Sequence, residues 1–170
     1  MKKKLQHFRD TLFISIAALL IFAGALPAAD HGHKLSEMER YRQIEESATV
    51  TCQDLVDLLL MVRGEFEKHP TAEKRIEHAR QEGWIKKLQP GEKLDRGHLA
   101  FSLIKTFDIN RGWLFRLTKM NRYALRDVQQ AGILSVRYGT GNHVSGAELI
   151  GAIHAAENYQ HEKTTWTEKH

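Results

Sequence analysis

The stretches VTCQDL (residues 50–55), LDRGHL (residues 94–99) and VSGAEL (residues 144–149) are three copies of one short phrase. Each copy runs from an apolar residue through a helix-capping residue and two variable residues to a polar residue and leucine. The second residue is Thr, Asp or Ser, whose side-chain oxygen caps a helix N-terminus. The first and last residues are placed to form a hydrophobic staple. Such a repeat indicates one supersecondary unit used about three times, and small helical repeats more often bind than catalyse.

An apolar pattern with the period of an α-helix follows each copy. The three stripes are Leu55, Leu58, Leu59 and Val62, then Leu99, Leu103, Ile104 and Phe107, then Leu149, Ala152, Ile153 and Ala156. Two further helices are predicted to end at Gly83 and Gly132, and each glycine precedes an apolar pair, as in a Schellman turn. The unit is a helix, a glycine stop, an apolar pair, a short loop and a capped helix. We expect an all-α fold, a compact helical repeat domain of about six helices.

The chain divides into four regions. Residues 1–29 open with three lysines, continue in an apolar run and end in small residues, which is the pattern of a secretory signal. An uncleaved N-terminal anchor is the alternative. Residues 30–49 are expected to be a leader and a charged helix, residues 50–157 the repeat domain, and residues 158–170 a frayed polar tail. The remainder of the chain is expected in the periplasm or cell envelope of a bacterium.

The positive charge of the chain belongs mainly to its N-terminal segment. The formal net charge of all 170 residues is +4. Four basic residues against Asp10 give residues 1–29 a net charge of +3, which leaves about +1 for residues 30–170. The mature region is therefore not globally basic, and nucleic-acid binding is not expected. Contact with a membrane is expected only if the N-terminal segment stays uncleaved.

The unit resembles the S-layer homology (SLH) repeat, over most of residues 50–157. The SLH repeat has a helix ending in Ala-x-x-x-Gly-Ile, a glycine-containing loop, and a Thr-Arg-Ala-Glu-Leu phrase that opens the next helix. The stretches of this chain that match the outline are residues 128–149 and 79–99, with the start of a third at residues 50–55. The resemblance implies three repeats around a pseudo-threefold axis and non-covalent binding of cell-wall polysaccharide or peptidoglycan. The family's ligand arginine falls at Cys52, Arg96 and Gly146, so only the middle copy keeps it.

The grooves between units are where this resemblance places the ligand. The expected glycan-binding residues are Trp84, Asp95 and Arg96 in one groove, and Arg137, Tyr138 and Asn142 in the next. Arg96 is expected to pair with an anionic group of the glycan.

A second candidate surface is a stretch rich in cations and aromatic residues that begins at residue 111. Its basic residues recur every three or four positions, which would place them on one helix face. They are Arg116, Lys119, Arg122 and Arg126. Such a face suits sugars, wall anions, lipid phosphates or a protein partner. The alternative is an ordinary solvated face that covers the helix, with Trp113 and Phe115 in the core.

Motifs for catalysis and for cofactors are not found. No nucleophile elbow, Walker loop or zincin motif occurs, and the ten histidines lack metal-ligand spacing. Only cleavage after residue 28 would create an N-terminal Cu(II) or Ni(II) chelate through His31. The lone Cys52 is expected to be buried and inert, with a reactive thiolate or an intermolecular disulfide as alternatives. We expect no enzyme activity, no cofactor and no metal.

Two functions remain after these exclusions. The first is a non-catalytic exported protein that binds cell-wall glycan through its repeats. The second is a helical periplasmic adaptor that docks an envelope protein, with the repeat serving only as scaffold.

Overall fold

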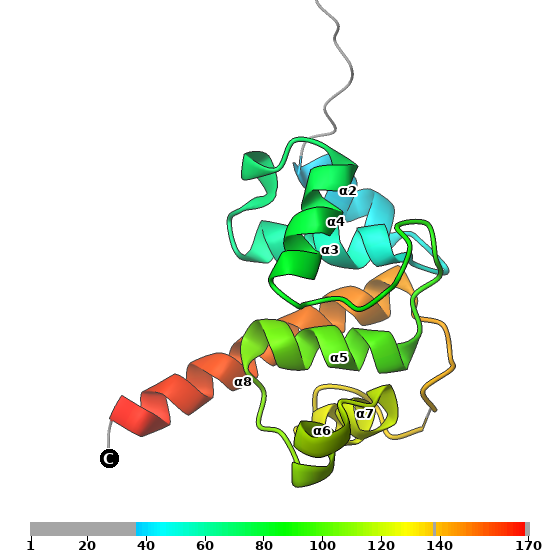
Figure 1. Ribbon diagram of the computed structural model, residues 1–170. Helices are drawn as coiled ribbons and strands as arrows, with labels where there is room; N and C mark the ends of the chain where they lie inside the picture. The colour runs from blue at the N-terminus through cyan, green and yellow to red at the C-terminus, as the bar shows by residue number, and fades with distance from the viewer. Residues whose placement is uncertain (1–36, 138, 169–170) are drawn as a thin grey trace, which may run out of the picture. The chain divides into compact units, whose positions relative to one another are not determined.

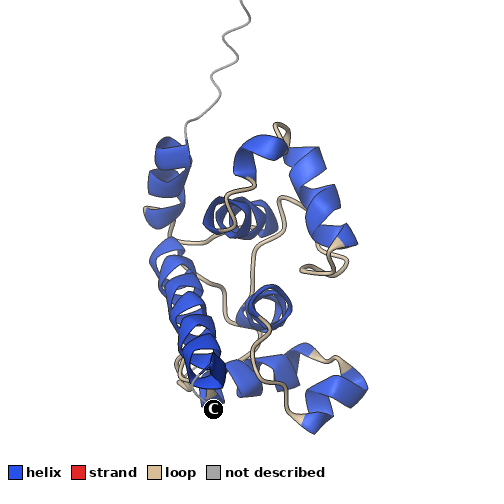
Figure 2. Cartoon of the chain, turned by 90° about the vertical axis from the view of Figure 1, so that its left-hand side faces the viewer, coloured by secondary structure: helices blue, strands red, loops and turns tan. Residues whose placement is uncertain are grey.

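The computed structural model describes residues 37–137 and 139–168, and these residues form an all-α fold, as the sequence predicts (Figure 1). The elements are α2 (Glu37–Glu45), α3 (Cys52–Val62), the 3₁₀ turn η1 (Phe66–Lys68), α4 (Ala72–Gln81), α5 (Arg96–Phe107), α6 (Trp113–Thr118), α7 (Asn121–Gln130) and α8 (Gly146–Glu168). Figure 2 shows only helices and loops in this part of the chain. The predicted signal segment lies outside the described residues.

Three backbone hydrogen bonds join the starts of the three phrases in a closed ring. The Val50 amide donates to the Val144 carbonyl (3.0 Å), the Val144 amide to the Leu94 carbonyl (3.1 Å), and the Leu94 amide to the Val50 carbonyl (2.9 Å). All three side chains are fully buried. The apolar residue that opens each phrase therefore has its amide and its carbonyl satisfied by the other two copies. Helices α3, α5 and α8 start around this ring.

The first turn of each of these helices is held by the neighbouring copy. The initial amides of a helix have no partner within the helix. Here the first amide of each helix donates to a carbonyl just before the next phrase. The pairs are Cys52 to Glu92 (2.9 Å), Arg96 to Asn142 (3.0 Å) and Gly146 to Ser47 (2.8 Å). The predicted caps also form, because Thr51, Asp95 and Ser145 each accept the amide three residues on.

Glycine stops end the helices that precede the second and third phrases. Gly83 and Gly132 have φ of 70° and 75°, a conformation that glycine adopts without a steric penalty. The amide after each glycine donates back to the helix, Trp84 to Ala79 (2.9 Å) and Ile133 to Val128 (3.1 Å). These are the predicted Schellman turns. The apolar pair after each glycine is buried, so the chain turns back onto the core before each phrase.

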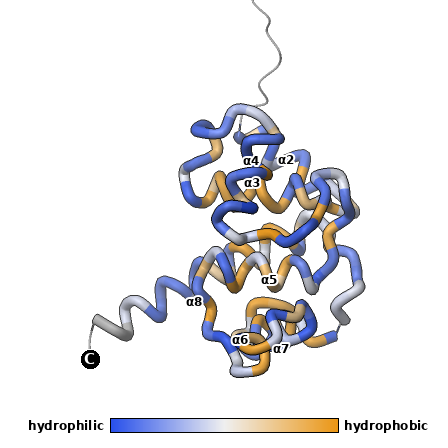
Figure 3. The backbone as a smooth tube through the Cα atoms, in the orientation of Figure 1, coloured by the Kyte–Doolittle hydropathy of each residue, from blue (hydrophilic) through white to orange (hydrophobic). Residues whose placement is uncertain are grey.

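Helix α3 lies at the centre of one half of the fold, in contact with α2, α4 and α8. Its predicted stripe is buried except for Val62, and two residues outside the stripe, Val56 and Leu60, are fully buried as well. Figure 3 shows hydrophobic stretches along α3 and α5. The unit of residues 36–170 contains the whole core formed by the described residues, so this fragment can be studied by itself.

A buried carboxylate joins α3 to the helices on either side. Asp57 is 1% exposed and accepts hydrogen bonds from Arg40 of α2 (2.7 Å) and Arg75 of α4 (2.7 Å). Gln53 of α3 donates to the same carboxylate (2.6 Å), and Arg40 also binds Asp54 (2.6 Å). A buried charge needs such partners, because an unpaired carboxylate would be strongly destabilising. Helix α2 is therefore fixed by charge as well as by its buried Ile44.

The predicted frayed tail is wrong for the part of it that the structure describes. Helix α8 continues to Glu168 instead of ending near residue 157. No glycine or proline follows Gly151, so nothing in the sequence stops this helix. Lys163 donates to the Asp108 carbonyl (3.1 Å), which ties the polar half of α8 to the end of α5. Figure 3 shows this outer half as mainly hydrophilic.

Helix α2 presses against the start of α8 at Gly146. A Cβ atom on Gly146 would lie 1.6 Å from the Ile44 carbonyl oxygen and 2.6 Å from its carbon. The obstruction is backbone, so no rotamer change relieves it. Gly146 is the third-copy counterpart of Arg96, and this packing explains why the third copy carries no side chain at that position.

We expect Gly146→Ala to lower the free energy of unfolding by about 3 kcal/mol or more, because the new methyl group must push α2 off α8. Gly151→Ala is the matched control, since its Cβ would have no neighbour within 4 Å in the same helix. That change should stabilise the fold by about 0.5–1 kcal/mol. Urea unfolding of residues 36–170 measures both. A neutral Gly146→Ala would contradict the packing of α2 on α8.

Candidate functional site

A groove of about 620 Å³ lies where the first glycine-stopped unit meets α5. It is formed by the end of α4, the segment after Gly83, the following loop and the first turn of α5. The lining residues are Arg80, Ile85, Lys86, Lys87, Leu88, Glu92 and His98. The Schellman turn determines this arrangement, because it buries Ile85 and Leu88 and leaves Lys87 exposed between them. Arg80 donates to the Leu88 carbonyl (2.9 Å) and holds the segment against α4.

Lys86 lines the groove, and its ammonium group is bound within the fold. Its Nζ donates to the Lys119 carbonyl (2.6 Å) and to Asn121 Oδ1 (2.8 Å), and it lies 4.3 Å from the centre of the Phe101 ring. Burial lowers the pKa of the Lys86 ammonium from its ordinary value. Lys86 therefore links the groove to the junction of α6 and α7, and its donors are largely used within the fold.

His98 forms the α5 side of the groove, and Asp95 holds it in place. The Asp95 carboxylate accepts the His98 backbone amide (2.8 Å) and lies 2.9 Å from His98 Nδ1. Burial alone would raise the pKa of the Asp95 carboxyl, but the hydrogen bonds from the His98 ring and amide outweigh it and hold that pKa below its ordinary value. Asp95 is thus a helix cap that orients His98, and it does not line the groove.

Trp84 does not face the groove. It is 4% exposed and packs edge-on against the His78 ring at 5.4 Å, with the Arg63 guanidinium 5.3 Å from its own ring centre. The next residue, Ile85, lies in the groove instead. The apolar pair after Gly83 turns one side chain into the core and the other toward the groove.

Arg96 is also buried, at 6% exposure. Its Nη2 pairs with Glu148 Oε1 at 2.5 Å, across the boundary between the second and third copies. Glu148 is the acidic residue of the third phrase. The one arginine that matches the SLH phrase therefore joins two units of the fold, and its guanidinium is not presented to a large ligand.

The second predicted groove is only partly described. Arg137 and Asn142 are exposed, and Tyr138 lies outside the described residues. Asn142 accepts the Gly139 amide through its side chain (3.1 Å) and the Arg96 amide through its carbonyl (3.0 Å), so it shapes the loop. The positions that hold Arg80, Lys86 and Lys87 in the first unit hold Gln129, Ser135 and Val136 in the second. The structure thus places this set of cations in the first groove and not in the second.

The predicted single face of basic residues is wrong. Helix α6 ends at Thr118, Lys119 has a left-handed φ of 52°, and α7 begins at Asn121. The four predicted residues Arg116, Lys119, Arg122 and Arg126 are all exposed, but they lie on two helices and the turn between them. No glycine or proline marks this break, and the helical spacing continues across it by chance.

Sequence reasoning missed the groove cations Arg80, Lys86 and Lys87. Their signal is present, because two lysines directly follow the apolar pair after a glycine stop. In the absence of a ligand motif, lysines in a loop are ordinary solvated residues, so the pattern alone did not single them out.

Cys52 is fully buried at the first turn of α3, as predicted. Burial raises the pKa of its thiol to about 11, although the nearby Arg80 lowers it. An intermolecular disulfide at Cys52 would require the fold to open.

No model of a known protein family matches this chain, and no curated protein matches it. In the part of the chain that the structure describes, no three metal-ligating side chains lie together. Among the same residues, every helix is too short or too polar to cross a bilayer.

We expect Arg96→Ala to lower the free energy of unfolding by about 2 kcal/mol, because Glu148 loses a charged partner in a poorly solvated position. Arg96→Met keeps the packing of the side-chain stem and should cost less. Urea unfolding measures each change, and a double-mutant cycle with Glu148→Gln isolates the pair. A coupling energy near zero would contradict the assignment of Arg96 to the fold.

We expect Cys52 to react with a maleimide at least about a hundredfold more slowly in the folded protein than in urea, because the thiol is buried and largely protonated. Mass spectrometry of timed samples at mildly alkaline pH measures the rate. Labelling of the native protein at the rate of the unfolded chain would show that Cys52 is accessible.

Proposed function

We propose that this protein is a non-catalytic bacterial envelope protein that binds an anionic cell-wall glycan in the groove beside α4 and α5. The carrying observation is the groove itself, where Arg80, Lys87 and His98 lie around an apolar floor of Ile85 and Leu88, with Glu92 as the one acidic lining residue. Sugar rings offer apolar faces that suit such a floor, and their carboxylate or phosphate groups suit the cations around it.

The arrangement of the three phrases supports this proposal. The ring formed by Val50, Leu94 and Val144 places three capped helices around one point, which is the arrangement implied by the resemblance to SLH repeats. Grooves between units are the ligand sites implied by the same resemblance. The groove beside α4 and α5 occupies such a position and carries the basic side chains that the second unit lacks.

The residues proposed to contact the ligand differ from those that the sequence suggests. Arg96 is committed to Glu148, and Trp84 is part of the core. Lys87 is exposed, and Arg80 is exposed as well, although its Nη2 donates to the Leu88 carbonyl (2.9 Å). His98 can donate or accept a hydrogen bond to a sugar hydroxyl through the ring nitrogen that Asp95 does not hold. These three side chains are the proposed contacts.

Co-sedimentation with peptidoglycan sacculi tests the proposal. Residues 36–170 should pellet with sacculi, and added salt should weaken the binding because the contacts are charged. Lys87→Glu should weaken the apparent affinity about tenfold, because it replaces a charge-assisted contact by a repulsive one.

Lys74→Glu is the matched control, since Lys74 is an exposed lysine of α4 that lies outside the groove. It should pellet like the parent. Failure of the parent to pellet at low salt would overturn wall binding. An equal loss in Lys74→Glu and Lys87→Glu would show that net charge, and not the groove, governs the association.

The adaptor function is the alternative proposal, and one observation favours it. An apolar hollow of about 220 Å³ lies between α2, α3 and α8 and is lined by Tyr41, Leu58, Met61, Val62, Ile150, Ile153 and His154. A partner helix could place an apolar side chain there. If sacculi do not retain the parent and one envelope protein co-purifies with it in equimolar amount, the adaptor function replaces wall binding.

A further inference from the structure

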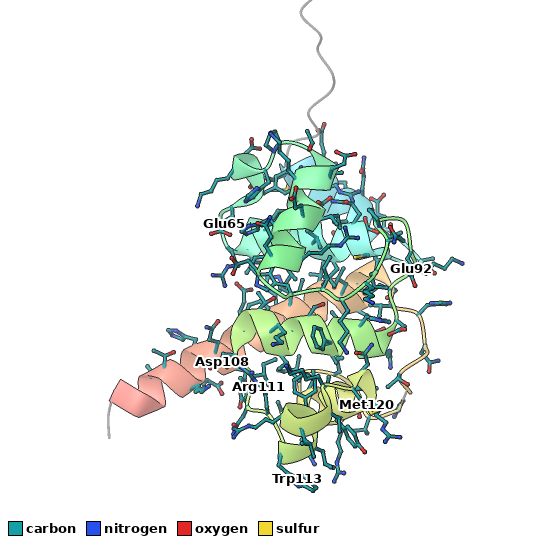
Figure 4. All side chains as sticks on the ribbon, viewed as in Figure 1. Glu65, Glu92, Asp108, Arg111, Trp113 and Met120 are labelled. Carbon is teal, nitrogen blue, oxygen red and sulfur yellow. The ribbon has the colours of Figure 1, made fainter. Side chains whose placement is uncertain are left out.

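Three large apolar side chains stand exposed within eight residues of the chain. Trp113 is 71% exposed, Leu117 75% and Met120 44%. Trp113 and Leu117 are four residues apart in α6 and therefore lie on the same face of that helix. Figure 4 shows Trp113 at the outer end of α6, pointing away from the fold. A tryptophan this exposed has lost the burial that normally stabilises it, so a cluster of this kind marks a contact surface.

The fold holds α6 firmly in this position. On the opposite side of the helix, Phe115 is 2% exposed, and its ring lies 5.9 Å from the Phe101 ring of α5. The Gly112 amide at the start of α6 donates to Asp127 of α7 (2.8 Å). The exposed face is thus presented by a helix anchored on both α5 and α7.

The surroundings of this face are positively charged. Residues 109–126 contain five basic residues and no aspartate or glutamate. Arg111 pairs with Asp108 at 2.7 Å. The other four, Arg116, Lys119, Arg122 and Arg126, are exposed, and none forms an ion pair with any residue that the structure describes. An anionic surface would complement this charge.

The combination points to a lipid surface as the partner. Tryptophan favours the headgroup region of a bilayer, and arginine and lysine extend their charged ends to lipid phosphates while their stems cover apolar surface. A protein partner is less well matched, because three apolar side chains are too few for a stable interface of about 800 Å² on each partner. Shallow insertion into a bilayer needs only a few apolar side chains and a basic rim.

We propose that α6 and its junction with α7 form a docking surface for an anionic phospholipid membrane. Trp113 and Leu117 insert between the headgroups, Met120 lies at the same boundary, and the four exposed cations bind lipid phosphates. This places a membrane contact in the folded region, separate from any contact that an uncleaved N-terminal segment would make. The inference does not depend on wall binding, because none of these side chains lines the groove.

Vesicle flotation of residues 36–170 tests the docking surface. This fragment lacks the apolar N-terminal run, which would otherwise bind lipid by itself. The fragment should float with vesicles of equimolar phosphatidylglycerol and phosphatidylcholine, and not with vesicles of phosphatidylcholine alone. Lipids brominated near the headgroup should quench the parent's tryptophan fluorescence and should quench Trp113→Ser less.

Variants of exposed residues identify the surface. Trp113→Ser combined with Leu117→Ser should weaken vesicle binding at least about tenfold, because two inserted apolar side chains are lost. Arg116→Gln and Arg126→Gln should each weaken it about fivefold. The matched controls are Met38→Ser, an equally exposed apolar residue on α2, and Lys74→Gln on α4, and both should bind vesicles like the parent.

Three outcomes would overturn the proposal: no flotation of the parent, equal flotation with neutral vesicles, or equal losses in the variants and their controls. Thermal melts followed by circular dichroism should match for all variants, since every changed residue is exposed. The α6 variants should also pellet with sacculi like the parent. A loss of vesicle binding with sacculus binding intact separates this surface from the proposed glycan groove.

Discussion

The closed ring of backbone hydrogen bonds between Val50, Leu94 and Val144 is the constraint on which the rest of the fold depends. Each of these residues is fully buried, so its amide and its carbonyl have no access to water. Removing any one copy would leave a buried amide and a buried carbonyl unpaired on the other two, which costs far more than the hydrogen bonds gain on average. In an open solenoid each repeat depends only on its neighbours. Here each copy depends on both others, so the fold is closed at three.

The ring also determines the surroundings of the residue that begins each helix. These residues occupy equivalent places, yet their environments differ because α2 is added on one side only. Cys52 is enclosed by the loop before the second phrase, Arg96 reaches across to Glu148 of the third copy, and Gly146 lies under the carbonyl of Ile44. An arginine would not fit at Gly146 at all. The backbone hydrogen bonds thus repeat at all three boundaries between units, but the side chains at these boundaries differ.

Local features of the fold are predictable from the sequence because their causes are local. The caps at Thr51, Asp95 and Ser145 and the stops at Gly83 and Gly132 depend on residues within one helical turn. The candidate site is less predictable, since exposure depends on partners far along the chain. Arg96 matches a ligand phrase but meets Glu148, fifty-two positions later. The helix break at Lys119 contains no glycine or proline, so the sequence does not predict it. Beyond residue 157 the sequence has no apolar period, so it does not predict that α8 continues. In each case the residue makes a contact with a distant part of the chain: Arg96 with Glu148, Lys119 with Lys86, and Lys163 with Asp108. A local sequence pattern does not predict such contacts.

The two proposed surfaces adjoin each other at Lys86, and the hydrogen bonds of its ammonium group explain why they are separate binding surfaces. Lys86 lines the groove, yet its Nζ is bound to the Lys119 carbonyl and to Asn121 at the α6–α7 junction, and burial lowers its pKa. Its charge therefore serves mainly to fasten the two regions to each other. The cations left for a ligand in the groove are those of Arg80 and Lys87, and the cations left for a lipid surface are the four around α6. Two separate cationic surfaces on one small domain would hold two anionic partners, a polymer and a layer, close to each other. Under the two proposals these are the cell-wall glycan and a phospholipid membrane, so together they describe a bridge between the wall and a membrane.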